Sequence, residues 1–220
     1  MNEFRISRPC AEVSFEEAST RLKPEVNLLE SLETVVTEVN RLIEPIGGFR
    51  IFDEVMIEEE RIIVGETVFL CHRKIARLLT GTTQLAILVC TLGEAVSELY
   101  AKYSTEYNFV NAYLCDRVAN MAIEKAVNEV KGSIRLLAEQ NQQKVTSQIS
   151  PGYCNWAIED QKKLFTLLPS EPCGISLTSS YLMQPMKSVS AVMGIGEEVK
   201  YKESDCRFCH LRKCIYRRSE

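Results

Sequence analysis

The stretch Leu85-Ala86-Ile87-Leu88-Val89-Cys90 decides the fold class, because it is apolar at every position. A strand with one face in water alternates apolar and polar residues, whereas a strand that is covered on both faces forms a continuous apolar run. Residues 84–91 are therefore predicted to form a buried central strand. The run is far too short to cross a bilayer, which takes about 20 residues in a helix.

Two long helices are predicted around this strand. Residues 107–140 form a helical stretch, and the small side chains of four alanines would let a neighbouring element approach it closely (Ala112, Ala119, Ala122 and Ala126). Residues 24–43 carry leucine and valine at three- and four-residue spacing, with Pro24 suited to the first helical position and Pro45 shortly after the end.

The remaining segments predict a mixed α+β fold, with a mainly antiparallel twisted sheet and long helices packed against it. Strands are expected at 49–57, 61–70, 175–178 and 188–194, and shorter helices at 72–79, after Thr91-Leu92-Gly93-Glu94, and at 157–168. Thr91 or Gly93 is expected to cap the second of these helices. His72 is expected to be a surface or capping residue.

Composition indicates one globular domain, expected over residues 1–204, with a Cys-rich basic tail at 205–220. The 220 residues are 45% hydrophobic and 25% charged, which allows a buried core. The net charge of -4 argues against nucleic acid as the main partner, because phosphate binding needs a basic face. No apolar signal segment follows Met1, so we expect a cytoplasmic protein with no membrane contact.

The stretch Ser150-Pro151-Gly152-Tyr153 has the composition of a turn rather than of a helix or strand. Proline and glycine give a rigid bend, and the tyrosine beside it offers a surface for a flat heterocycle. A Pro-Gly-Tyr tripeptide alone is more often only a turn with a packed aromatic ring. Its flanks are therefore needed to give it a function.

Three segments after this turn complete a pattern with it: Glu159-Asp160-Gln161-Lys162-Lys163-Leu164-Phe165, Gly174-Ile175-Ser176-Leu177-Thr178-Ser179-Ser180-Tyr181-Leu182-Met183 and Pro185-Met186-Lys187-Ser188-Val189-Ser190. In this order and spacing, the turn and the three segments resemble the activation domain of cobalamin-dependent methionine synthase. The resemblance covers about residues 70–205. Thr91-Leu92-Gly93 and the helix with Asp116 and Glu124 are similar to the stand-alone versions of that domain.

The resemblance implies a role in reactivating a cobalamin-dependent methyltransferase. The domain would bind S-adenosylmethionine over the corrin ring of cobalamin, which is held by a partner chain. A flavodoxin- or ferredoxin-like donor would supply one electron to cob(II)alamin, and the sulfonium methyl would remethylate the cobalt. The domain's own task would be to position the methyl group and exclude water, with no acid–base pair.

The resemblance also implies which residues lie at the ligand: Gln148, Ser150, Gly152, Tyr153, Thr178 and Tyr201. Gln148 stands where the large enzymes carry an arginine that pairs with the ligand carboxylate. Asn120 and Ser179 each stand where those enzymes carry a glutamate. A glutamine hydrogen-bonds a carboxylate but brings no charge. Lys144 and Arg117 are candidate replacements for the missing cation.

A separate set of candidate metal ligands lies at the C-terminus, where Cys206, Cys209 and Cys214 have C-x2-C-x4-C spacing. A CxxC pair can chelate one ion through both thiolates. Zinc or an iron–sulfur cluster is therefore a hypothesis, with Cys10, Cys154, Cys173, His210 or a partner as the source of a fourth ligand. The alternatives are inert thiols in a basic tail and a simple disulfide.

Two other functions fit the same sequence. One is a metal- or iron–sulfur-binding electron-transfer adaptor, which the tail cysteines favour. The other is a non-catalytic module that only binds the corrinoid protein.

The scattered Cys90 and Cys115 lie among apolar neighbours and are predicted to be small core residues.

Overall fold

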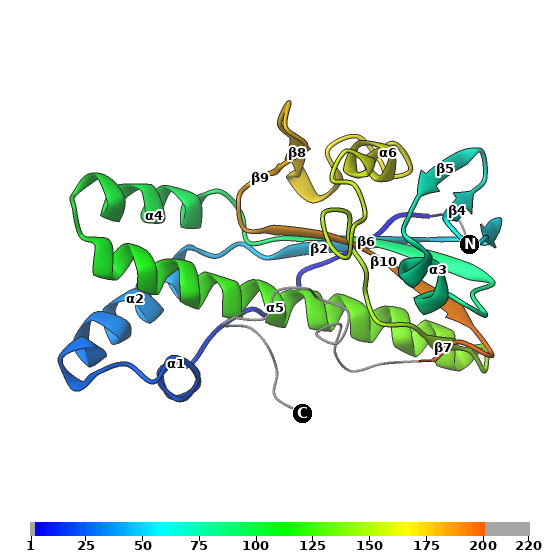
Figure 1. Cartoon of the computed structure of the whole chain (residues 1–220). Coiled ribbons are helices and arrows are strands. Elements are labelled where there is room, and N and C mark those ends of the chain that lie inside the picture. Colours follow the sequence, from blue (N-terminus) through cyan, green and yellow to red (C-terminus); the bar gives the residue numbers. More distant parts are fainter. Residues whose placement is uncertain (1–2, 201–220) are drawn as a thin grey trace.

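A five-stranded antiparallel sheet forms the centre of the molecule, in a computed structural model that describes residues 3–200 (Figure 1). Its strands are β1 (Arg5–Ser7), β2 (Ile46–Phe52), β6 (Gln84–Thr91), β7 (Lys144–Val145) and β10 (Ser188–Gly196), in the order β1-β2-β6-β10-β7. All four pairings are antiparallel. The predicted α+β class is confirmed.

Strand β6 lies in the middle of this sheet, between β2 and β10, over the predicted residues 84–91. Its side chains alternate between two separate hydrophobic cores. Ala86, Leu88 and Cys90 belong to one core. Leu85, Ile87 and Val89 belong to the other. Since both faces of the strand are covered, every position between Leu85 and Cys90 is apolar.

Helix α5 (Phe109–Gln140) covers one face of the sheet, and α1 (Phe15–Leu22), α2 (Leu29–Leu42) and α4 (Ala95–Thr105) pack against α5 as part of the same hydrophobic core (Figure 1). The four alanines of α5 are all buried, in agreement with the close approach of a neighbouring element that their small side chains predict. Close contact between α5 and the sheet also requires a glycine on β2. A Cβ atom at Gly47 would lie 2.4 Å from Cγ2 of Val130 on α5.

Smaller elements cover the other face. They are α3 (Arg73–Leu78), α6 (Asp160–Thr166) and a second sheet of β3 (Val55–Ile57), β4 (Arg61–Val64) and β5 (Thr67–Leu70). A short hairpin of β8 (Ser176–Leu177) and β9 (Met183–Gln184) lies on the same side of the main sheet as α6 (Figure 1). The 3-10 turn η2 (Pro172–Gly174) precedes this hairpin.

The predicted strands at 49–57 and 61–70 are each two strands. Residues 46–52 join the central sheet, and the chain then leaves it after Phe52, so β3 pairs only with β4. The 61–70 run folds back at Gly65, whose φ of +55° a glycine adopts without strain, so β4 and β5 form a hairpin. Elements β1, α1, β7 and β9 were not predicted.

Helix boundaries agree with the sequence patterns to within a few residues, and one cap prediction was wrong. The predicted helix at 24–43 begins as the 3-10 turn η1 (Val26–Leu28) and continues as α2. His72 is the N-cap of α3, and its Nδ1 accepts a hydrogen bond from the Lys74 amide. The N-cap of α4 is Glu94, not Thr91 or Gly93; the Thr91 hydroxyl accepts from the Gly93 amide within the preceding turn.

Within residues 3–200, no helix is both long enough and apolar enough to span a membrane. The expected domain boundary at residue 204 lies outside the described residues, so the division into a domain and a tail stays a prediction.

Candidate functional site

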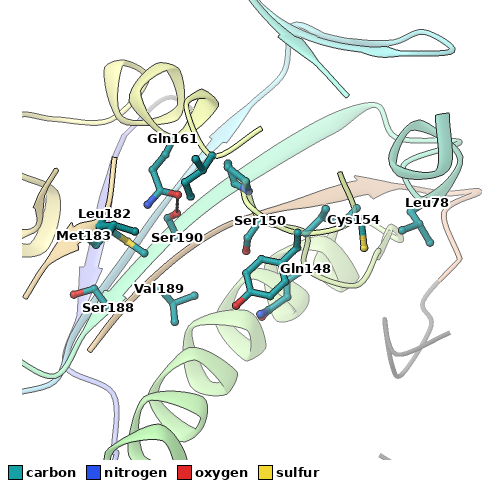
Figure 2. Close-up of a pocket in the computed structure, with 14 residues that line it drawn as sticks. Leu78, Gln148, Ser150, Cys154, Gln161, Leu182, Met183, Ser188, Val189 and Ser190 are labelled. Atoms are coloured by element: carbon teal, nitrogen blue, oxygen red, sulfur yellow. Dashed lines mark hydrogen bonds between the residues drawn. The ribbon is translucent and has the colours of Figure 1, made fainter. Parts of the chain in front are cut away.

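A pocket of about 450 Å³ opens between the 148–158 loop, the first turn of α6, the β8–β9 hairpin and the beginning of β10 (Figure 2). This volume is within the range of small-molecule sites in proteins. Its lining consists of Leu78, Gln148, Ile149, Ser150, Pro151, Tyr153, Cys154, Ile158, Gln161, Leu182, Met183, Ser188, Val189 and Ser190. The predicted heterocycle site is thus part of the wall of a pocket.

The Pro-Gly-Tyr turn is held in place by backbone hydrogen bonds at both of its ends. Ile149 exchanges two of them with Val192 on β10, at 2.9 and 2.8 Å, and the Gly152 amide donates to the Trp156 carbonyl at 2.8 Å. Gly152 has φ +88°, and a Cβ atom there would lie 3.0 Å from Cδ1 of Ile158. Glycine is therefore required by the turn itself.

Trp156 anchors the end of this loop in the core. Its side chain is 2% exposed and packs edge-on against Phe69, with ring centroids 5.8 Å apart. Its indole N–H donates to Oδ2 of the buried Asp160 at 2.8 Å, while Oδ1 of Asp160 lies 2.8 Å from the Lys163 ammonium. The carboxylate is therefore satisfied on both oxygens, and it joins the loop to α6.

Six residues were expected at a ligand, and the structure brings three of them to the pocket wall: Gln148, Ser150 and Tyr153. Gly152 shapes the turn without lining the pocket. Thr178 also lies outside the wall, where its hydroxyl accepts a hydrogen bond from the amide of Leu182, a residue that does line it. Tyr201 lies outside the described residues.

The described pocket wall carries no charged side chain. Lys187, which directly precedes Ser188, is buried and directed elsewhere, with Nζ 2.5 Å from Oδ1 of Asp116 and 2.9 Å from Oδ1 of Asn120. Lys144 and Arg117, the candidate replacements for an arginine, are not among the lining residues. The Oε1 atom of Gln148 is buried without a hydrogen-bond partner in the described part of the chain.

Sequence reasoning did not assign a role to several residues of the wall. Gln161, Leu182, Ser188 and Ser190 all belong to the segments that carry the resemblance, yet none was expected at a ligand. Their position depends on strand β10 lying beside the 148–158 loop, which no local pattern predicts.

The candidate metal ligands Cys206, Cys209 and Cys214 lie outside the described residues. Within residues 3–200, no three histidine, cysteine, aspartate or glutamate side chains are grouped as a metal site would require. Zinc or iron–sulfur binding at the tail therefore stays a prediction.

The cysteines with raised pKa values predict a pattern of chemical labelling. Burial raises the pKa of Cys71, Cys115 and Cys173 to about 11 and that of Cys90 to about 12. Because only the thiolate reacts and a raised pKa lowers its fraction at pH 8, we expect iodoacetamide to label exposed Cys10 quickly, partly buried Cys173 slowly, and buried Cys71, Cys90 and Cys115 only after denaturation. Peptide mass mapping measures each site, and labelling of native Cys90 as fast as Cys10 would contradict the predicted core.

Comparison with known protein families identifies the chain. Residues 75–205, more than half of its length, match the family described as "Vitamin B12 dependent methionine synthase, activation domain". The chain belongs to this family. The match includes every element of the pocket, from Leu78 to Ser190, and confirms the resemblance noted from the sequence.

Among solved structures, the fold is similar to the crystal structure of the MetH reactivation domain bound to AdoHcy, with a TM-score of 0.62. The similarity covers 91% of this chain and 81% of that chain, at 14% sequence identity. At this identity the likeness shows a shared fold. A comparison with curated protein sequences gave no match.

Proposed function

We propose that this chain binds S-adenosylmethionine in the pocket beside Tyr153 and supports the reductive remethylation of cob(II)alamin on a separate methyltransferase chain, methionine synthase. The observation that carries the proposal is the pocket at the Pro-Gly-Tyr turn in a chain of the activation-domain family. The structural relative with AdoHcy bound is further support, since AdoHcy is what S-adenosylmethionine becomes when it gives up its methyl group.

The residues of the pocket fit such a ligand in size and in polarity. An uncharged wall with apolar residues and a few amides and hydroxyls suits a nucleoside, and exposed Tyr153 offers a ring face to a base or a sulfonium cation. The unpartnered Oε1 of Gln148 can accept a hydrogen bond from the α-ammonium group, and rotation of the amide would let its nitrogen donate to the carboxylate.

In the proposed reaction an electron donor, flavodoxin- or ferredoxin-like, gives one electron to cob(II)alamin, and the sulfonium methyl then bonds to cobalt while the S–CH3 bond breaks. S-adenosylhomocysteine leaves. The part of this chain is to bind the methyl donor, to orient it, and to cover it against water.

An anaerobic assay with the partner methyltransferase tests this role. The chain, a chemical reductant, S-adenosylmethionine labelled at its methyl group and the cob(II)alamin form of the methyltransferase are combined. We expect label on the cobalamin only when all four are present. Equal labelling without the chain would contradict the proposal.

Gln148→Arg is expected to increase the affinity for S-adenosylmethionine. An arginine adds a charge-assisted pair with the ligand carboxylate, for which the described pocket wall has no cation, so the dissociation constant should fall about tenfold. Adenosine, which has no carboxylate, is the matched control and should bind both proteins alike. Calorimetric titration measures both ligands. An equal change for the two would show that residue 148 does not face the carboxylate.

The tail cysteines support a second candidate function, an electron-transfer adaptor. It predicts visible absorption and bound iron, or bound zinc, in anaerobically purified protein. A colourless and metal-free sample would remove this candidate and leave the first one unaffected.

A further inference from the structure

Gln161 is an almost fully buried polar residue in the wall of the pocket. It lies in the first turn of α6, is 2% exposed, and contacts a strand that is distant in the sequence. The hydroxyl of Ser190 on β10 donates a hydrogen bond to its Oε1 at 3.0 Å. In the structure the oxygen end of the amide therefore faces Ser190.

With its oxygen toward Ser190, the amide directs its nitrogen, which carries two N–H donors, away from that hydroxyl. Figure 2 shows this nitrogen pointing away from Ser190, to the side on which Leu182 and Met183 lie, and it forms no hydrogen bond with another residue of the wall. This nitrogen is open to the pocket, and a ligand that covered it without offering an acceptor would leave a buried donor unsatisfied, which is costly. Its place in the wall is explained if a bound ligand supplies the acceptor.

The surroundings select the kind of acceptor. A carboxylate would be buried beside Gln161 with no cation in the described wall to balance it, which is unfavourable. A neutral ring nitrogen needs only a donor.

We infer that Gln161 recognises an acceptor nitrogen of the ligand's heterocycle and that Ser190 is the residue that positions it. This inference rests on the proposed function, since it assigns the contact that selects the base of the ligand. It also gives the pocket a direction, with the heterocycle at α6 and the remainder of the ligand toward Gln148.

Adenosine and its 1-deaza, 3-deaza and 7-deaza analogues test the assignment, because each analogue lacks one ring nitrogen. In calorimetric titrations of the wild-type chain, we expect one of the three to bind about tenfold more weakly than adenosine. Gln161→Leu should bind adenosine about tenfold more weakly and should bind that analogue no worse than adenosine. A merely structural role of Gln161 would not remove the discrimination between the two probes.

Two further variants keep the test decisive. Gln161→Glu has nearly the same shape but cannot donate when ionised, so it should also lose the discrimination if the leucine variant fails to fold. Ser190→Ala keeps the amide but frees it to rotate, and about threefold weaker adenosine binding is expected. Thermal unfolding without ligand shows whether each variant is folded.

The outcomes separate the two proposals. If wild-type chain binds S-adenosylmethionine but all three analogues bind like adenosine, or if Gln161→Leu keeps the discrimination, the role of Gln161 is overturned and the proposed function stands. If neither S-adenosylmethionine nor adenosine binds, both are overturned.

Discussion

Replacing Asp160 by alanine is expected to lower the free energy of unfolding by about 2–3 kcal/mol and to weaken ligand binding at least tenfold. The change leaves the indole N–H of Trp156 buried without an acceptor, and an unsatisfied buried donor of this kind costs about 1–3 kcal/mol. The ion pair with half-exposed Lys163 adds little to the effect.

The loss of affinity follows from the connection between Asp160 and the pocket. Trp156 is tied to the Pro-Gly-Tyr turn by the hydrogen bond from the Gly152 amide to the Trp156 carbonyl, so loosening the indole also loosens Ser150 and Tyr153. Asp160→Asn is the matched control, since its amide oxygen can still accept from the indole, and about 1 kcal/mol is expected. Urea unfolding and calorimetric titration measure the two effects. Equal results for the alanine and asparagine variants would contradict the role of the hydrogen bond.

Gly196→Ala is expected to destabilise the fold by about 3 kcal/mol, through overpacking at the end of β10. A Cβ atom at this position would lie 2.3 Å from the carbonyl oxygen of Gly81, which is backbone and cannot rotate away. The loop is held there by the hydrogen bond from the Thr83 amide to the Ile195 carbonyl at 2.9 Å. Glycine is therefore needed for close backbone approach rather than for its dihedral angles.

Gly132→Ala supplies the control for this variant. Gly132 lies inside helix α5 and a Cβ atom there meets nothing within 4 Å, so alanine should stabilise the protein by about 0.5–1 kcal/mol. In thermal unfolding, the two variants should shift Tm in opposite directions, by about 6–12 °C downward and about 1–4 °C upward. A Gly196→Ala protein as stable as the wild type would contradict the packing of β10 against the Gly81 loop.

The sequence predicts those parts of the fold that local patterns determine. The apolar run Leu85–Cys90 predicts the central strand because both of its faces are buried, and the alanines of 107–140 predict the helix that packs closely against the sheet. The division of 49–57 into β2 and β3 is different. Both halves carry apolar residues, on either side of Asp53-Glu54, and the pairing partners, residues 84–91 and 61–64, show that the first half belongs to the central sheet and the second half to the smaller one.

The candidate site could also be predicted only where its features depend on local sequence. The Pro-Gly-Tyr turn is visible in the sequence, because proline and glycine restrict or permit particular dihedral angles locally. Gln161 appears there only as one polar residue of an amphipathic helix. Its burial and orientation come from Ser190, 29 positions later, and from the pairing of Ile149 with Val192. Likewise, the absence of charged side chains from the pocket wall becomes apparent only when the segments that form the wall are brought together in the structure.

The central claim is that the pocket beside Tyr153 binds S-adenosylmethionine, and an anaerobic calorimetric titration of the wild-type chain with this ligand tests it most directly. We expect saturable binding of one ligand per chain, weakened at least tenfold by Asp160→Ala and strengthened by Gln148→Arg. No saturation at about 1 mM ligand, with a folded wild-type protein, would contradict the claim.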